Sequence, residues 1–141
     1  MNFESVDLRI LVENVFATTL GMTVTPVMAN DEWPVRRAAV AIRGSWSGRV
    51  VVAATDAVLR STVASMCHVH PHECGESDLT DALLELTNVL GGSVKSLLPE
   101  DCRLGLPEIL STPPTGSPDA DRTFRCDGEP VRLWVEGAAT A

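Results

Sequence analysis

Two pairs of short alternating segments, each joined by a hairpin-length turn, constrain the fold of this chain more than any other feature. In the first pair, Ala38, Val40 and Ile42 recur at every second position, which is the period of a half-buried strand. The glycine-bounded loop 44–48 then leads to a β-branched run at 49–54. Connections this short join antiparallel strands, because parallel strands need a much longer crossover.

A second hairpin is predicted near the C-terminus. Residues 123–126 and 131–136 alternate on either side of a turn at 127–130. Residues 22–28 show a weaker strand pattern, and residues 103–110 show another that a proline interrupts. About six antiparallel strands are therefore expected.

Three helices are predicted around these strands from apolar residues at helical spacing. They cover residues 7–20, 56–66 and 78–98. Gly21 is a natural residue to follow the first helix, Thr55 is a typical N-cap for the second, and Ser77 or Asp78 can cap the third. The resulting order is helix, three strands, two helices, three strands. It indicates an α+β fold in which helices cover one face of an antiparallel sheet.

The length of 141 residues is that of one domain, so residues 1–141 are expected to form a single unit. Residues 111–119 contain three prolines and a glycine, which indicates an exposed loop inside the domain rather than a linker. The small residues at 137–141 are expected to fray.

The charge balance limits the possible partners. Eleven Lys and Arg stand against 19 Asp and Glu, so the net charge is −8 at pH 7. An acidic surface repels phosphate backbones, and no nucleic-acid partner is expected. No apolar run approaches the roughly 20 residues of a membrane helix, and the first seven residues lack the basic start of a signal peptide. A cytoplasmic location without membrane attachment, and four reduced cysteines, are therefore expected.

The segment 78–98 carries the most functional information. At about 100° per residue, its leucines and valines fall on one face, which predicts burial. A second set falls within about 40° of one line on the opposite face. That line consists of Asp81, Glu85, Asn88, Gly92 and Lys95. Asparagine and glycine are poor helix formers, which favours a docking surface; the alternative is a solvated face on a helix that ends early at Gly91.

This helix resembles a known signature. Residues 81–92, Asp-Ala-Leu-Leu-Glu-Leu-Thr-Asn-Val-Leu-Gly-Gly, are similar to the signature helix of the CheC/CheX/FliY family of response-regulator phosphatases. The family pattern is Glu-x-x-Asn with a small residue or glycine following in the same helix. The segment Leu104-Gly105-Leu106-Pro107 and the order of elements also resemble CheX-like domains.

The resemblance implies a specific activity. Family members hydrolyse the aspartyl phosphate of a CheY-like receiver domain. Asn88 matches the family asparagine that orients the attacking water, and Glu85 matches the glutamate that pairs with a receiver lysine. Asp81, Gly92 and Lys95 would complete the partner-binding surface. The resemblance places Mg²⁺ on the receiver, so no cofactor is expected on this chain.

Some family members carry two such helices. In the first predicted helix, Glu13 and Asn14 are adjacent and so point about 100° apart, which cannot reproduce the Glu-x-x-Asn pair. One active site is therefore expected, which is the CheX-like arrangement, and the resemblance implies a homodimer. The main alternative is a non-catalytic adaptor that uses the same helix to bind a receiver or a scaffold.

Two other segments suggest chemistry less strongly. Residues 67–74 gather three histidines and two cysteines, and such tracts can bind zinc. Their spacing matches no usual zinc pattern, so no metal site is predicted, and Cys67 is expected to pack at the end of the second helix. A metal-binding regulatory domain stays as a third hypothesis. No nucleophile elbow accompanies these histidines, and Trp46 in loop 44–48 is expected to pack back over its hairpin.

Overall fold

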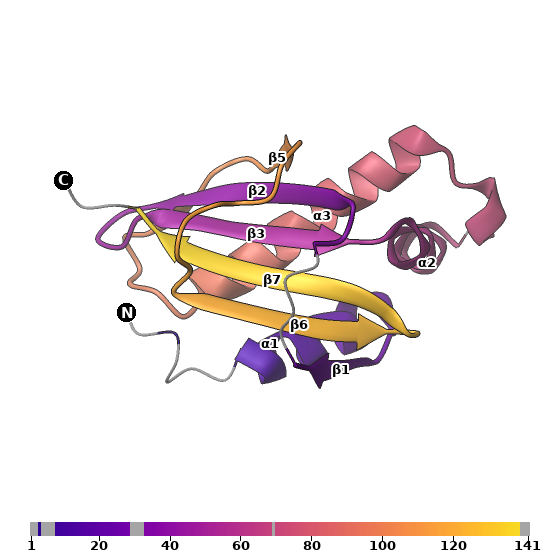
Figure 1. Ribbon diagram of the computed structural model, residues 1–141, viewed down its shortest axis with the longest axis horizontal. Helices are drawn as coiled ribbons and strands as arrows, with labels where there is room; N and C mark the ends of the chain where they lie inside the picture. The colour runs from indigo at the N-terminus through magenta and orange to yellow at the C-terminus, as the bar shows by residue number, and fades with distance from the viewer. Residues whose placement is uncertain (1–2, 4–7, 29–32, 69, 139–141) are drawn as a thin grey trace.

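The computed structural model describes residue 3 and residues 8–28, 33–68 and 70–138 (Figure 1). Its elements, in chain order, are α1 (Leu8–Val15), the π-helix η2 (Phe16–Leu20), β1 (Val24–Val27), β2 (Arg36–Arg43), β3 (Gly48–Ala54), α2 (Asp56–Cys67), the 3-10 helix η3 (Pro71–Glu73), α3 (Glu76–Lys95), β4 (Arg103–Leu104), β5 (Glu108–Leu110), β6 (Ala120–Cys126) and β7 (Glu129–Gly137). The predicted α+β class is confirmed.

The strands of the described residues form one seven-stranded antiparallel sheet in the order β1-β6-β7-β3-β2-β4, and β5 also pairs with β2 (Figure 1). Both predicted hairpins are present, and β3 pairs with β7 to join them. In the β6–β7 turn, Asp127 and Gly128 have φ angles of 51° and 80°, as a two-residue hairpin turn requires. The predicted strand at 103–110 is divided into β4 and β5, with Pro107 between them.

The helices cover one face of this sheet (Figure 1). Alternation along β3 directs Val50 and Val52 toward the helices, where they join the main core. Val51 points to the opposite face and packs with Trp134, while Trp33 lies beside them. The sheet is thus buried by helices on one side and partly covered by its own connecting segments on the other.

The helix boundaries differ from the expected ones in local ways. The predicted helix 7–20 is α-helical only to Val15 and continues as a π-helix, which Gly21 closes in the left-handed conformation with φ 63°. Thr55 is confirmed as an N-cap, because its Oγ1 accepts a hydrogen bond from the Val58 N–H at 3.3 Å.

The expected cap of α3 is wrong. Its N-cap residue is Gly75, whose N–H donates to the Asp78 carboxylate at 2.9 Å. Asp78 therefore satisfies the helix start from inside the first turn. The helix ends at Lys95 and gives way to turns before Pro99. Gly137, expected in a frayed tail, belongs to β7, whereas residues 139–141 lie outside the described residues.

Arg36, at the start of β2, ties the N-terminal ends of α2 and α3 to the sheet. Its Nε donates to Asp56 at 2.5 Å, and its terminal nitrogens donate to both carboxylate oxygens of Glu76 at 2.6 Å. These hydrogen bonds hold the pKa values of Asp56 and Glu76 below their ordinary values. One guanidinium therefore fixes the ends of two helices relative to the sheet.

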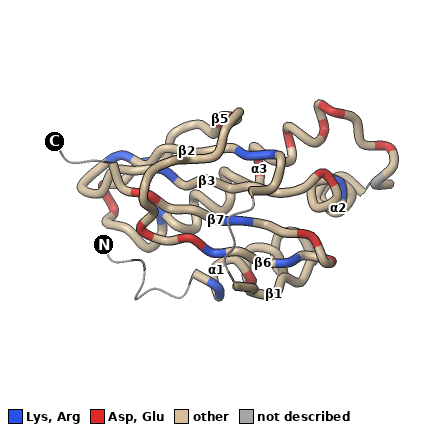
Figure 2. Tube along the Cα trace, viewed as in Figure 1, with Lys and Arg blue, Asp and Glu red and all other residues tan. Residues whose placement is uncertain are grey.

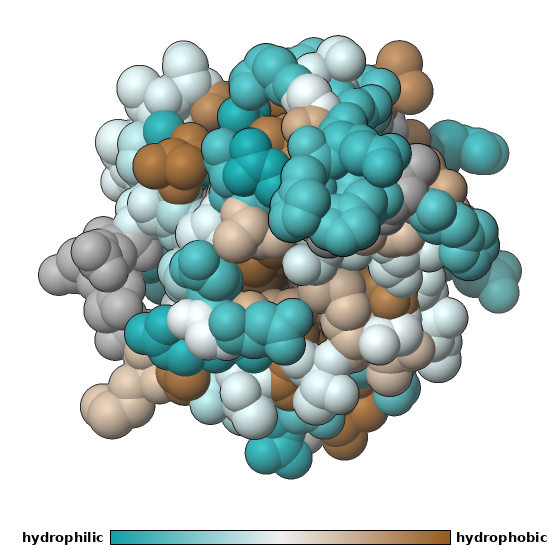
Figure 3. All heavy atoms as spheres, turned by 90° about the vertical axis from the view of Figure 1, so that its right-hand side faces the viewer, coloured by the Kyte–Doolittle hydropathy of each residue, from teal (hydrophilic) through white to brown (hydrophobic). Residues whose placement is uncertain are grey.

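Charged residues are unevenly distributed. Figure 2 shows acidic positions around the α2–α3 connection and basic positions at both ends of β2. Figure 3 looks onto the end of the molecule that carries α2, where hydrophilic residues gather at the top and hydrophobic residues show between them. None of the described helices combines the length and the apolar run that a membrane crossing needs.

Candidate functional site

Helix α3 lies in the middle of the helical layer, in contact with α1, α2, β2 and β3. Its inner face is buried through Leu83, Leu86, Leu90 and Val94, as the periodicity predicted. The helix continues through the glycine pair without a break. Gly91 is buried, and a Cβ at that position would overlap Cγ1 of Val40 in β2. The first glycine therefore lets the helix lie close to the sheet.

The predicted line of residues occupies the outer face of α3. Asp81 and Glu85 are exposed, whereas Asn88, Gly92 and Lys95 are half-buried. Within the described part of the chain, the side chains of Asp81, Glu85, Asn88 and Lys95 make no hydrogen bond or ion pair. The structure thus brings the predicted site residues together on one surface and leaves their polar groups available to a partner.

Gly92 differs from its neighbour Gly91. A Cβ on Gly92 would meet no atom closer than Cδ2 of Leu104, at 3.9 Å, which is an ordinary van der Waals distance. Packing inside the chain therefore does not require a glycine there. The open position lies one helical turn beyond Asn88, on the same face, where another molecule can approach the backbone of α3.

Hollows flank this surface on both sides. A groove of about 300 Å³ lies between α2 and α3, with Met66 and Cys67 opposite Asp81 and Glu85. A wider groove of about 490 Å³ runs between α1–η2 and α3, where Ile10 and Asn14 face Ser93. Sequence reasoning missed these flanking residues because they come from other helices, and no spacing rule links them to α3. Asn14 is exposed there, while Glu13 forms an ion pair with Arg9 at 3.7 Å.

A protein-family model for the chemotaxis phosphatase CheX matches residues 37–122, a span that contains all of α3 and both predicted catalytic residues. The chain belongs to the CheX family. No curated protein sequence matches it.

Solved structures of CheX-like proteins share the fold. The chain resembles the chemotaxis protein CheX from Vibrio vulnificus with a TM-score of 0.75 and 17% identity, over 90% of this chain and 91% of that one. A chemotactic CheC-like protein from Shewanella oneidensis gives a TM-score of 0.69 and 19% identity, over 98% and 100%. A CheX–CheY–BeF₃–Mg²⁺ complex from Borrelia burgdorferi gives a TM-score of 0.68 and 12% identity, over 89% and 92%.

The histidine- and cysteine-rich segment of this CheX family member joins α2 to α3. Cys67 ends α2 but is exposed, so the expectation that it packs there is wrong. Its successor, His68, is the C-cap residue of α2 and takes a left-handed conformation with φ 56°. The rings of His70 and His72 lie 3.9 Å apart. Among the described residues, no three His, Cys, Asp or Glu side chains are grouped to hold a metal ion.

Trp46 packs back over its hairpin, as expected. Its ring meets the ring of Phe3 edge-on, with centroids 5.6 Å apart. It also lies under Gly48, where a Cβ would overlap the indole. This tryptophan therefore belongs to the core of the CheX-like fold rather than to a contact surface.

Proposed function

We propose that this chain hydrolyses the aspartyl phosphate of a CheY-like receiver domain, with Asn88 and Glu85 as its functional pair. One observation carries the proposal. The two side chains lie one helical turn apart on the open face of α3 and have no partner among the described residues. Beyond them, Gly92 leaves the helix backbone accessible for no reason of internal packing.

The proposed role of Asn88 follows from the chemistry of an acyl phosphate. This bond is already activated, so hydrolysis needs a water molecule positioned in line more than it needs a strong base. A carboxamide can accept a hydrogen bond from that water and donate one, and it carries no charge that repels the phosphoryl group. A carboxylate at the same position would repel it.

Glu85 is proposed to anchor the receiver. Its exposed carboxylate lies one turn from Asn88, where it can pair with a receiver lysine at a distance from the phosphate. Asp81 and Lys95, at the two ends of the same line, would extend the contact surface. Mg²⁺ is expected on the receiver, and the Borrelia burgdorferi CheX complex contains CheY together with Mg²⁺ and BeF₃.

The test is the decay of receiver-bound phosphate with and without this protein, for candidate receivers from the same genome. We expect faster decay, which Asn88→Ala reduces by about a hundredfold while receiver binding stays. Glu85→Gln should weaken binding instead. Asp127→Asn is the matched control: it removes one carboxylate from the exposed β6–β7 turn, where asparagine tolerates the left-handed conformation.

Other outcomes would redirect the proposal. Receiver binding without faster decay, unaffected by Asn88→Ala, would favour the adaptor function on the same helix. Absence of binding by every receiver would overturn both. A cytoplasmic location, as expected from the sequence, is consistent with the proposed reaction. The homodimer stays a prediction, which sedimentation equilibrium would test.

A further inference from the structure

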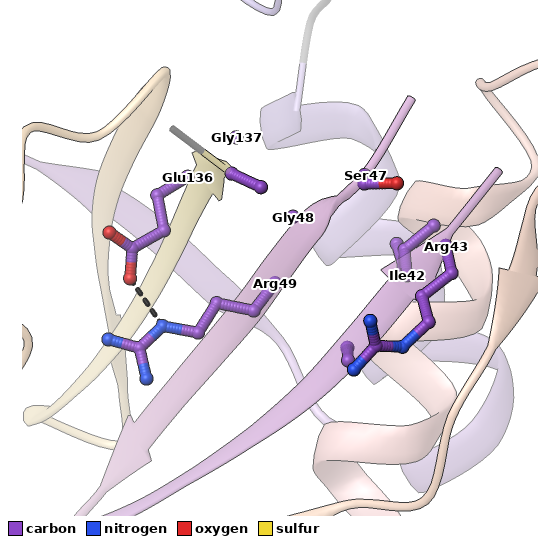
Figure 4. A pocket seen from close by; sticks show the side chains of 9 residues that line it. Ile42, Arg43, Ser47, Gly48, Arg49, Glu136 and Gly137 are labelled. Carbon is purple, nitrogen blue, oxygen red and sulfur yellow. Dashed lines mark hydrogen bonds and ion pairs between the residues drawn. The ribbon is translucent and has the colours of Figure 1, made fainter. Parts of the chain in front are cut away.

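A further hollow lies on the outer face of the sheet, away from the helices. It has a volume of about 430 Å³ and forms where β2, β3 and β7 meet beside the β2–β3 turn (Figure 4). Its wall includes Ala41, Arg43, Gly48, Arg49, Glu136 and Gly137. None of these residues belongs to the proposed phosphatase site on α3.

Strand register explains why the surface is hollow at this place. Ala41 lies opposite Arg49, and Arg49 lies opposite Glu136, so the three form one row across the outer face. Ala41 is the one small residue in this row. In the neighbouring row, Gly48 of β3 lies opposite Gly137 of β7. Small residues therefore form a floor, and long charged side chains stand around it.

The two arginines of the wall are held differently. Nε of Arg49 donates to the Glu136 carboxylate, which fixes the guanidinium and leaves its terminal nitrogens for another acceptor. Arg43 is exposed and has no hydrogen bond or ion pair within the described residues. Figure 4 shows both side chains on the same face of the strands, with the link from Arg49 to Glu136.

A third arginine lies next to this pocket. Arg103 in β4 pairs directly opposite Arg43 in β2, and it too lacks a partner among the described residues. Like charges at directly opposite strand positions are destabilising. This placement is unexpected in a chain of net charge −8, whose carboxylates outnumber its basic groups. A bound anion would relieve the repulsion.

We propose that this pocket binds a small molecule through a phosphate or carboxylate group held between Arg43 and Arg49. Guanidinium groups bind both kinds of anion in a bidentate manner. The volume lies within the range of about 300–1,000 Å³ that small-molecule sites occupy. Glu136 places one negative charge in the wall and is paired with Arg49. Two further carboxylates lie at this end of the sheet: Asp101 accepts hydrogen bonds from Ser45, and Asp119 lies beside Gly137. Arg43 and Arg103 are the basic groups here that have no ion pair among the described residues.

The test is a titration of the ¹⁵N-labelled chain at low ionic strength, with pyrophosphate and citrate as separate probes for the phosphate and carboxylate arms. We expect amide shifts confined to Gly48, Gly137 and Ala138, and a dissociation constant that Arg43→Gln raises by about tenfold. Arg43→Gln removes no hydrogen bond or ion pair within the described residues, so the variant should fold normally. Arg125→Gln is the matched control, because Arg125 is exposed on the same sheet face at the opposite end.

Each outcome decides the matter. Binding of pyrophosphate alone or citrate alone supports the site and names its anion. Shifts that Arg43→Gln and Arg125→Gln reduce equally would mean general screening and would overturn the proposal. Absence of shifts with both probes would overturn it as well. The titration contains no receiver, so its failure leaves the phosphatase proposal untouched.

Discussion

Gly91 and Gly92 are neighbours in α3 but face different surroundings. Gly91 points at Val40 of β2, where no side chain fits. A Cβ at Gly92 would enter open space on the line that contains Asn88. A glycine at this position therefore weakens the helix without a benefit to packing. A residue that lowers helix stability on the proposed docking face fits a requirement set by a partner rather than by the folded chain.

Gly92→Ala should therefore stabilise the protein and impair its function. The added methyl meets no close neighbour, and we expect the free energy of unfolding to rise by up to about 1 kcal/mol. The same methyl should obstruct a receiver and weaken its binding on the order of tenfold. Urea denaturation and receiver binding together check this, and unchanged binding would contradict the docking role of Gly92.

Gly91→Ala should act in the opposite way on stability. Its Cβ would overlap Val40 Cγ1, which lies in the packed core. We expect the free energy of unfolding to fall by about 1–3 kcal/mol, as for other overpacked sites. The midpoint of urea denaturation measures this loss of stability. If Gly91→Ala proved as stable as Gly92→Ala, α3 would be able to shift away from β2.

At the scale of elements, the Arg36 network couples stability to pH. The pKa values of Asp56 and Glu76 are lowered in the folded chain. Both ion pairs therefore add stability above the unfolded pKa values, about 4, and lose it as the pH falls through the lowered ones. We expect Arg36→Gln to unfold at a lower urea concentration than the parent chain at pH 7. The difference between the two urea midpoints should shrink below pH 4.

Arg103→Gln is the control for this experiment, because it removes the same charge from a side chain without an ion pair among the described residues. It should show no comparable loss at pH 7. A gap between the parent chain and Arg36→Gln that stays constant from pH 7 to pH 3 would mean that Arg36 acts through packing alone.

The elements that could be predicted from the sequence depend on near neighbours. Thr55 caps α2 by accepting a hydrogen bond from a residue three positions along the chain, and the Asp127–Gly128 turn joins adjacent strands. The π-helix η2 could not be predicted, since over five residues its apolar pattern resembles that of an α-helix. Arg36 could not be assigned partners either, because Asp56 and Glu76 lie 20 and 40 positions away.

The same distinction holds for the candidate site. The line from Asp81 to Lys95 follows from helical geometry alone, so its common face was predictable. Met66 and Ile10, which flank it with 41% and 51% of their surface exposed, come from α2 and α1. Only tertiary packing brings them beside α3, and a single sequence does not record which helices are neighbours.

For the molecule as a whole, we expect folding to be independent of metal. The chain builds a continuous core from helices and sheet, and all four cysteines are free. Untagged protein should contain less than stoichiometric zinc by mass spectrometry, and a chelator should leave the thermal midpoint unchanged. Stoichiometric zinc, or a lower midpoint with chelator, would support the metal-binding hypothesis for residues 67–74.

The position of the three tryptophans determines what intrinsic fluorescence can report. Trp33 and Trp134 pack at a tilt on the outer face of the sheet, with ring centroids 5.3 Å apart, and the guanidinium of Arg132 lies over both rings. Trp46 packs against Phe3 near the β2–β3 turn. None of them belongs to α1, α2 or α3. Tryptophan emission will therefore follow unfolding of the sheet but stay nearly silent when a partner docks on α3, so an optical assay of docking requires a dye placed on the helical face.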